Sequence, residues 1–339
     1  MRKTKTLLLV QWLAVCALGL VLWPSTSAEA ATHGKTKHHL RAGTHGKAAV
    51  IKKRHGRAQR LKRKVSYAPP PAPSFGHAVG LQDTQAPLEL KSSVAFVVDQ
   101  NTNEVLINKN SNAVLPIASI TKLMTALVVT EKALPLNEKL SVTQDDVEAT
   151  AGNRSRLQLG TELTRGEFLH LALMSSENRA AHVLGRTYPG GMQPFVVEMN
   201  RKARELGMTE THYVEPTGLS SSNQSSAVDL TRLIRAVYAV PLIRELTTST
   251  EAVVPVGRRQ VEFHSTNRLV QNPNWDIGLQ KTGTLSAAGH CLVMQAKLAG
   301  RDLIMVLLDS AGRYSRIGDA ERIRKWLVAS APSLVPQPR

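Results

Sequence analysis

Apolar and polar positions along the chain predict strands at both ends of a globular region that starts near residue 91. Two runs rich in β-branched and aromatic residues, 94–99 and 104–108, are separated by Gln-Asn-Thr-Asn, which is typical of a hairpin. Strand-like runs return later as TEAVVPV, RQVEFHS, IGLQKTGTL, GHCLVMQAKLAG and RDLIMVLLDS. An amphipathic helix over 319–329 is expected after the last of them.

The section between these groups of strands has the periodicity of helices. A helix over 118–130 is predicted because apolar residues recur at the spacing of one buried face: Ile117, Ile120, Met124 and Leu127. Thr164 and Glu167 form a capping-box pattern that starts a second helix. Three more helices are predicted from ENRAAHVLGRTY, MQPFVVEMNRKARELGM and SAVDLTRLIRAVYAV, the second ending at Gly207 and the third at Pro241.

This order of elements predicts an α+β fold, in which helices cover an antiparallel sheet and a mostly helical subdomain is inserted. The 339 residues are enough for one large domain with a full-sized core. We expect this domain to span 91–330 and to leave a short tail at 331–339.

The first 30 residues predict an export signal. Three basic residues precede the apolar run from Leu7 to Trp23, and Ala28 and Ala30 occupy the small-residue positions of a cleavage site. An uncleaved anchor is the alternative, because a run of about 17 residues is the short limit for crossing a bilayer. We expect a periplasmic protein. Without the signal, Cys291 is the one remaining cysteine, so no intramolecular disulfide can form.

Positive charge is concentrated before the predicted domain. Residues 1–68 contain 15 Lys and Arg against one acid, whereas the net charge of the whole chain is +17. We predict a disordered basic arm and then a proline-rich linker across 31–90, because this composition cannot bury enough apolar surface to fold. Anionic envelope polymers are the expected partner, and a merely solvated tail is the alternative. Nucleic acid is not expected as a partner of an exported protein.

Three short motifs carry the candidate chemistry: SITK at 119–122, SEN at 176–178 and KTG at 281–283. Each motif is weak alone, but together they fall in the contexts that their chemistry requires. Ser119 and Lys122 are three residues apart on a predicted helix and therefore share a face. Asn178 falls between two predicted helices, and Lys281 falls in a predicted strand.

This combination can activate a serine. A serine hydroxyl is a weak nucleophile unless a neighbouring base takes its proton. Lys122 can be that base, because partial desolvation and the nearby charge of Lys281 would lower its pKa. Each motif also has a purely structural explanation. Lys122 could extend from an apolar helix face to solvent, and Ser176 and Asn178 could cap the end of a helix.

With these motifs the chain resembles the penicillin-recognising serine D,D-peptidases, in particular the D-alanyl-D-alanine endopeptidases of the penicillin-binding protein 7 type. The likeness covers about residues 90–330. It includes VVDQNTNEVL, LPIASITKLMTALVV, LALMSSENRAA, TYPGG, YVEPTGLSS, QKTGTLSAAGHCLVM and DAERIRKWL. The resemblance implies a β-lactamase/transpeptidase-like fold, no metal and no cofactor.

The resemblance also implies catalytic roles for four residues. Ser119 would be the acylated nucleophile and Lys122 its general base. Ser176 would pass a proton to the leaving amine, and Asn178 would hold the substrate backbone.

The KTG strand is implied to bind the substrate. Lys281 and Thr282 would recognise the terminal carboxylate of a peptide, or the equivalent group of a β-lactam antibiotic. Gly283 and Thr284 continue this strand, and the backbone N–H groups of Ser119 and Thr284 would form the oxyanion hole. The implied reaction is hydrolysis of the D-alanyl to diaminopimelyl cross-bridges of peptidoglycan.

Three other functions stay open. A D-alanyl-D-alanine carboxypeptidase is the first, although such relatives usually append a β-rich domain and a membrane-binding helix, and only PSLVPQPR follows the last predicted helix. A class A β-lactamase is the second, with Glu215 of EPTGL activating water. The third is a wall-binding protein without catalysis.

Overall fold

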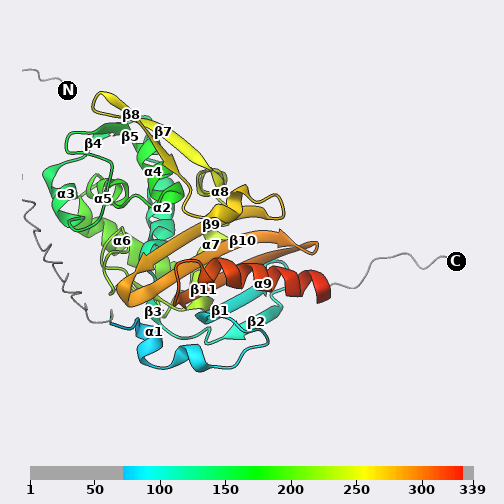
Figure 1. The fold of residues 1–339 in the computed structure, drawn as a ribbon. Coiled ribbons are helices and arrows are strands. Elements are labelled where there is room, and N and C mark those ends of the chain that lie inside the picture. The colour runs from blue at the N-terminus through cyan, green and yellow to red at the C-terminus, as the bar shows by residue number, and fades with distance from the viewer. Residues whose placement is uncertain (1–71, 331–339) are drawn as a thin grey trace, which may run out of the picture. The chain divides into compact units, whose positions relative to one another are not determined.

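The computed structural model describes residues 72–330, at whose centre lies a five-stranded antiparallel sheet (Figure 1). The strand order is β2-β1-β11-β10-β9, so the first strand in the chain pairs with the last. The bounds are Ser92–Asp99 (β1), Val105–Lys109 (β2), Asp276–Leu285 (β9), Gly289–Leu298 (β10) and Arg301–Ser310 (β11). The predicted hairpin and the last three predicted strands are confirmed.

The sheet is covered on both faces. Every residue of β1 is buried. Val94 and Phe96 belong to the core beneath the helical section, whereas Ala95 and Val97 pack in a second core with α9 (Ser315–Ser330). Successive strand residues point to opposite faces, so β1 contributes to both cores. Figure 1 shows α9, in red, running across the sheet on the side opposite to the other helices.

The helical section lies between β2 and β9 in the chain. Its central helix is α2 (Thr121–Glu131), in which every residue from Thr121 to Val129 is buried. A helix buried on all sides must be surrounded by other elements. The helices that contact α2 are α4 (Arg165–Met174), α5 (Asn178–Arg186), α6 (Met192–Glu205) and α7 (Ala227–Tyr238). Two more helices pack against these: α3 (Gln144–Ala149) contacts α5, and α8 (Pro241–Thr248) contacts α4 and α7.

Short strand pairs connect these helices to one another. They are β3 (Leu115–Pro116) with β6 (Gln224–Ser225), β4 (Lys139–Ser141) with β5 (Glu162–Thr164), and β7 (Glu251–Val256) with β8 (Arg259–His264). The predicted capping box at the start of α4 is confirmed: Thr164 Oγ1 accepts from Glu167 N, and the Glu167 carboxylate accepts from Thr164 N at 2.7 Å.

Between β2 and β9, the sequence missed two helices. Pro241 was expected to end a helix, but α7 ends at Tyr238 and Pro241 begins α8. Proline is suited to the first turn of a helix, because its missing N–H has no partner there and its φ is already helical. The other missed helix, α3, is only six residues long and has its own capping box at Thr143 and Asp146.

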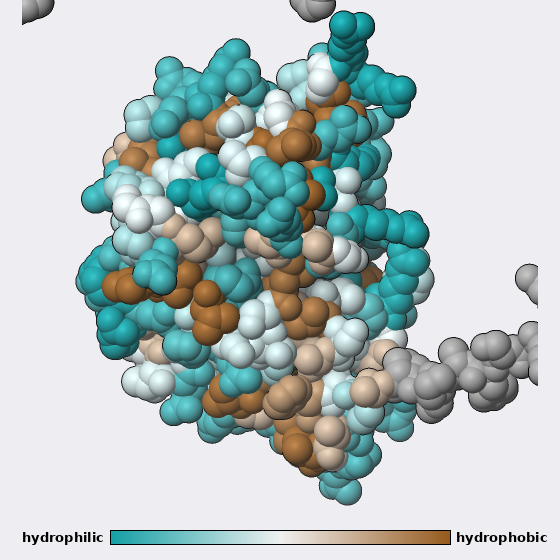
Figure 2. Space-filling model, turned by 90° about the vertical axis from the view of Figure 1, so that its left-hand side faces the viewer, coloured by the Kyte–Doolittle hydropathy of each residue, from teal (hydrophilic) through white to brown (hydrophobic). Residues whose placement is uncertain are grey.

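The described chain starts before the predicted boundary at residue 91. Residues 72–90 contain α1 (Phe75–Ala78), in which Gly76 is buried, and the 3₁₀ turn Leu81–Asp83. No helix within 72–330 is long and apolar enough to cross a membrane. On the side that Figure 2 shows, apolar residues are scattered among hydrophilic ones. The export signal, the basic arm and the tail lie outside the described residues, and the domain bounds stay predictions.

Candidate active site

Ser119 lies in a tight turn that leads into α2. The 3₁₀ turn Ala118–Ile120 connects β3 to the helix, and Thr121 Oγ1 donates to Ala118 O at 2.8 Å. Ala118 has a φ of 47°, a left-handed conformation that a residue with a side chain rarely adopts. Such strained positions persist where surrounding structure enforces them, and they cluster at functional sites.

Two glycines allow other segments to reach this turn. A Cβ on Gly218, whose φ is 84°, would lie 2.0 Å from Ala118 O. A Cβ on Gly283 would lie 3.0 Å from Ile117 O and 3.2 Å from Ser119 N. Gly218 has no room for a side chain, and at Gly283 a side chain would fit only if its neighbours moved. The EPTGL loop and the KTG strand therefore both touch the serine turn through their glycines.

Lys122 is buried and contacts the serine directly. Its Nζ lies 2.8 Å from Ser119 Oγ, 2.7 Å from Asn178 Oδ1 and 2.5 Å from Thr217 O. Burial lowers the pKa of Lys122 to about 8, against the opposing effect of the negative charges of Glu215 and Glu177. An amine with this pKa is partly neutral near pH 7 and can accept a proton from the serine hydroxyl.

Lys281 and Ser176 form a second pair. Ser176 lies between α4 and α5 with a φ of 61°, and Lys281 Nζ donates to its Oγ at 2.8 Å. Lys281 is fully buried in β9, and this burial holds its pKa well below the usual range. The charges of Lys122 and Arg316 lower it further. The hydroxyl of Thr282, next along the strand, lies 2.6 Å from Thr266 Oγ1.

The eight candidate residues meet at one cleft of about 790 Å³. Six of them line it: Ser119, Ser176, Asn178, Thr282, Gly283 and Thr284. Lys122 and Lys281 are fully buried and support the lining serines from behind. The structure thus brings together three motifs that are more than 50 residues apart.

The sequence missed the basic wall of this cleft, formed by Arg268, Arg313 and Arg316. Arg316 is only 8% exposed, and its Nε has no hydrogen-bond partner. Burial lowers the pKa of Arg316. Because Arg268, Arg313 and Arg316 line the cleft, their guanidinium groups are suited to a carboxylate there. For Arg313 and Arg316, the signal in the sequence is the arginine content of AGRYSRIGD, which resembles an ordinary solvated loop.

Glu215 does not have the surroundings of a water-activating base. Its carboxylate accepts hydrogen bonds from Thr217 N at 2.6 Å, Gly218 N at 2.7 Å and Asn223 Nδ2 at 2.9 Å. The Thr217 hydroxyl and Ser220 N donate to it as well. These contacts occupy its acceptor sites and hold the EPTGL loop in shape.

Within 72–330, one group of three side chains is close enough to share a metal ion: Glu251, Glu262 and His264. All three are exposed on the β7–β8 hairpin, and none of them lines the cleft. The side chains that line the cleft carry hydroxyl, amide, guanidinium and imidazole groups.

Known proteins are similar to this chain in sequence. Residues 81–312 match the family described as D-alanyl-D-alanine carboxypeptidase. The chain is 45% identical over 274 residues to a D-alanyl-D-alanine endopeptidase of Pseudomonas aeruginosa, a match that covers 80% of this chain and 86% of that one. It is 44% identical over 271 residues to a D-alanyl-D-alanine endopeptidase of Escherichia coli, with 79% and 87% covered.

Solved structures share the fold. The Streptomyces K15 DD-transpeptidase matches with a TM-score of 0.66 and 23% identity, over 73% of this chain and all of that one. Penicillin-Binding Protein D2 from Listeria monocytogenes, in a cefotaxime-bound form, matches with a TM-score of 0.62 and 28% identity, over 71% and 98%. The predicted α+β, transpeptidase-like fold is confirmed.

Proposed function

Because the chain belongs to the D-alanyl-D-alanine carboxypeptidase family of serine peptidases, we propose that it is a D,D-endopeptidase that opens the D-alanyl to diaminopimelyl cross-bridges of peptidoglycan. The observation that carries the mechanism is the buried contact of 2.8 Å between Lys122 Nζ and Ser119 Oγ. The identity of 44–45% to two D-alanyl-D-alanine endopeptidases supports the choice of substrate. The export-signal pattern supports a location in the periplasm.

The first half-reaction forms an acyl-enzyme. Neutral Lys122 takes the proton of Ser119 as Oγ attacks the D-alanyl carbonyl carbon. The backbone N–H groups of Ser119 and Thr284 hold the resulting oxyanion. When the C–N bond breaks, Ser176, which contacts Lys281, passes a proton to the leaving amine. Water then hydrolyses the ester and frees Ser119.

Other residues of the cleft recognise the substrate. Asn178 holds the substrate backbone while its Oδ1 also contacts Lys122 Nζ at 2.7 Å. Thr282 and the guanidinium group of Arg316, which both line the cleft, bind the carboxylate of the leaving residue. A β-lactam presents a similar carboxylate beside its reactive carbonyl, so we expect penicillin to acylate Ser119.

Digestion of purified cross-linked peptidoglycan, with products identified by mass, tests this function. The full chain should convert cross-linked dimers to monomers, and Ser119→Ala should abolish both this conversion and labelling by a fluorescent penicillin. Ser222→Ala, at an exposed serine outside the cleft, is the matched control and should retain both. Dimer cleavage by Ser119→Ala would overturn the assignment.

A carboxypeptidase is the second candidate, and the family described as D-alanyl-D-alanine carboxypeptidase favours it. The same digestion separates the two, because a carboxypeptidase releases free D-alanine from pentapeptides without reducing the number of cross-links.

The basic arm at 31–68 is proposed to bind anionic envelope polymers, on the strength of its charge alone. Deletion of 31–68 should weaken binding of the protein to purified cell envelopes, and added salt should weaken binding of the full chain. Unchanged, salt-insensitive binding would contradict this partner.

A further inference from the structure

A second cavity of about 640 Å³, here called the hairpin pocket, adjoins the cleft. It lies between the end of β8, the loop before β5 and the turn between α4 and α5, and its lining is Phe263, His264, Thr266, Arg154, Ser155, Arg156, Ser175 and Glu177. Thr266 lines the cleft as well. Asn153 and Ser176 line the cleft, whereas the residues that follow them in the chain line the hairpin pocket. The two cavities therefore share a wall.

This wall is the part of the cleft that handles the leaving group. In the proposed mechanism, Ser176 passes a proton to the leaving amine and Thr282 binds the carboxylate of the leaving residue. Thr282 Oγ1 lies 2.6 Å from Thr266 Oγ1, and Ser176 stands between Ser175 and Glu177 in the chain. Both of the groups that contact the leaving residue therefore adjoin the hairpin pocket.

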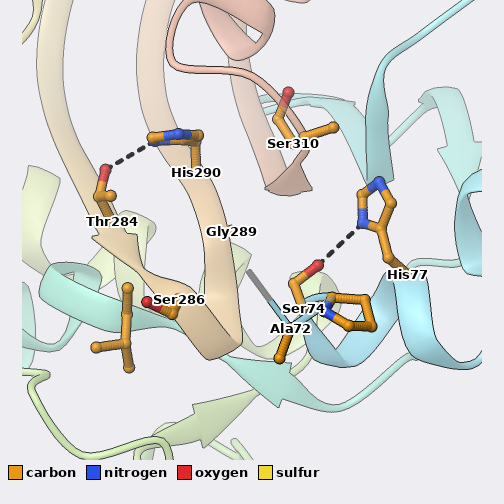
Figure 3. Close-up of a pocket in the computed structure, with 11 residues that line it drawn as sticks. Ala72, Ser74, His77, Thr284, Ser286, Gly289, His290 and Ser310 are labelled. Carbon is orange, nitrogen blue, oxygen red and sulfur yellow. Dashed lines mark hydrogen bonds between the residues drawn. The ribbon is translucent and has the colours of Figure 1, made fainter. Parts of the chain in front are cut away.

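The acyl part of the substrate belongs to another region of the cleft. The N–H of Thr284 holds the oxyanion in the proposed mechanism, and the Thr284 hydroxyl contacts His290 at 3.0 Å. Figure 3 shows this contact beside a separate cavity, with His77 on the other side. No residue of the described chain lines both that cavity and the hairpin pocket. The hairpin pocket therefore lies on the leaving-group side of the attacked bond.

The exposed charges of the hairpin pocket include two guanidinium groups. Arg154 and Arg156 are both exposed, and none of the arginine ion pairs within 72–330 involves them. The guanidinium of Arg156 lies 4.1 Å from the centroid of the Phe263 ring and donates to Glu262 O, which fixes it against β8. Glu177, the one acid among the described lining residues, is only 8% exposed and caps α5. Unpaired guanidinium groups beside a cavity are suited to a carboxylate.

The two candidate reactions differ in what leaves. A carboxypeptidase frees D-alanine, which ends at the carboxylate that Thr282 binds. An endopeptidase frees a diaminopimelyl residue, whose far end carries a second amino acid centre and with it the rest of a peptide strand. This strand ends in a further carboxylate. A cavity beyond the leaving residue therefore has an occupant only in the endopeptidase reaction.

We propose that the hairpin pocket is the subsite for the peptide strand that the reaction releases, and that Arg154 and Arg156 bind the C-terminal carboxylate of this strand. This inference rests on the proposed function. The two guanidinium groups form charge-assisted hydrogen bonds with the carboxylate. The pocket thereby distinguishes a cross-bridge from an uncross-linked pentapeptide.

Three synthetic peptides test the subsite. They share the acyl part up to the attacked D-alanine and differ in the leaving group. It is D-alanine in the first, diaminopimelyl-D-alanine joined through its side-chain amine in the second, and the C-terminal amide of that same group in the third. We expect the full chain to cleave the second peptide with a kcat/KM about tenfold above that of the third.

A charge reversal locates this preference. Arg154→Glu should lower kcat/KM for the second peptide alone and remove its advantage over the third. Arg258→Glu makes the same change of charge at an exposed position in the turn of the β7–β8 hairpin, outside both cavities, and should preserve the advantage. Acylation of Ser119 by benzylpenicillin, which has no leaving strand, reports that each variant is folded.

Failure of the subsite and failure of the function give different results. Equal cleavage of the second and third peptides, or an equal loss for both in Arg154→Glu, overturns the subsite and leaves the endopeptidase intact. Loss of the preference in Arg258→Glu also overturns the subsite, because the net charge of the protein would then decide it. If neither diaminopimelyl peptide is cleaved, the proposed endopeptidase function itself fails, and cleavage of the D-alanine peptide alone identifies a carboxypeptidase.

Discussion

Helix α5 takes part in two groups of buried charges that are compensated in opposite ways. At its first residue, Asn178 contacts Lys122, whose ammonium is surrounded by neutral oxygens and has no carboxylate in contact. Further along, His182 and Arg186 both contact Asp146, which is completely buried at the start of α3. One group leaves its charge without a counter-ion, and the other pairs it fully.

The pKa values of Asp146 and Lys122 are both lowered, but for opposite reasons. For Asp146, hydrogen bonds and the charge of Arg186 outweigh burial, so its pKa falls far below 3.8 and the charged form is favoured. For Lys122, burial dominates and the neutral form is favoured. We expect the paired cluster to matter for stability and the unpaired lysine to matter for reactivity. The two groups should therefore respond differently to substitution.

The largest effect is expected from Lys122→Met. Without its base, Ser119 should be acylated by fluorescent penicillin at least about a thousandfold more slowly. The free energy of unfolding should change less than in Asp146→Asn, because removing a buried ammonium also removes its desolvation cost. Lys202→Arg changes a lysine on α6 outside the cleft and is the control. It should be acylated by fluorescent penicillin at the rate of the native protein. Normal acylation of Lys122→Met would remove Lys122 from the mechanism.

Asp146→Asn should show the reverse pattern. It leaves Arg186 and His182 without their buried counter-ion, so we expect a loss of about 3 kcal/mol in the free energy of unfolding, measured by urea denaturation. The rate of penicillin acylation of the folded protein should be retained. If Asp146→Asn is as stable as the native protein but is acylated slowly by penicillin, the cluster serves the reaction instead.

Because the folded-state pKa of Asp146 is lowered, its stabilising contribution should be complete above about pH 4 and lost as the pH falls below it. Denaturation midpoints of the native protein should therefore decrease more steeply toward pH 3 than those of Asp146→Asn. If the midpoints of the two proteins fall in parallel with pH, the pairing of Asp146 with Arg186 and His182 would be contradicted.

The acylation rate should rise with pH through the pKa of Lys122, about 8. The base must be neutral to accept a proton, so the rate should increase about 50-fold from pH 6 to pH 8 and level off above pH 9. Stopped-flow acylation by a chromogenic β-lactam measures this profile. A flat profile between pH 6 and 9 would show that the proton leaves by another route.

The smallest effect is expected from Glu215→Gln. Its charge raises the pKa of Lys122 without touching the lysine, so its removal should move the midpoint of the pH profile to lower pH. Weaker hydrogen bonds in the EPTGL loop should slow acylation about tenfold. The penicillin acyl-enzyme should keep its lifetime of minutes to hours. Fast turnover of penicillin that Glu215→Gln abolishes would instead indicate a β-lactamase.

The local parts of the site could be predicted from the sequence. Ser119 and Lys122 are one turn apart, so helical periodicity alone places their side chains together, and KTG lies in a strand with a readable pattern. The contact of Lys281 with Ser176 spans 105 residues and follows only from how β9 and the α4–α5 turn pack. No periodicity encodes such a contact, and the sequence indicated only that the three motifs belong to one site.

Other features could not be predicted, because their sequence signals have a more common explanation. Arg313 lies just before the last helix and Arg316 in its first turn, where arginines are normally solvated, and only the tertiary fold turns them toward the cleft. Pro241 was interpreted as a helix stop, although proline is equally suited to a helix start. The carboxylate of Asp309 is hidden in an apolar strand, and nothing around it in the sequence indicates that one oxygen lacks a partner.

The order of strands in the sheet has a consequence for the newly made chain. β1 is held between β2 and β11, and the strand with Lys281 pairs only with β10, so the sheet closes when the last third of the chain arrives. Ser119 and Lys122 are synthesised well before the strands that complete the cleft. Contacts between such distant segments form late in folding. Under the proposed function, the cleft is therefore complete only in the finished fold.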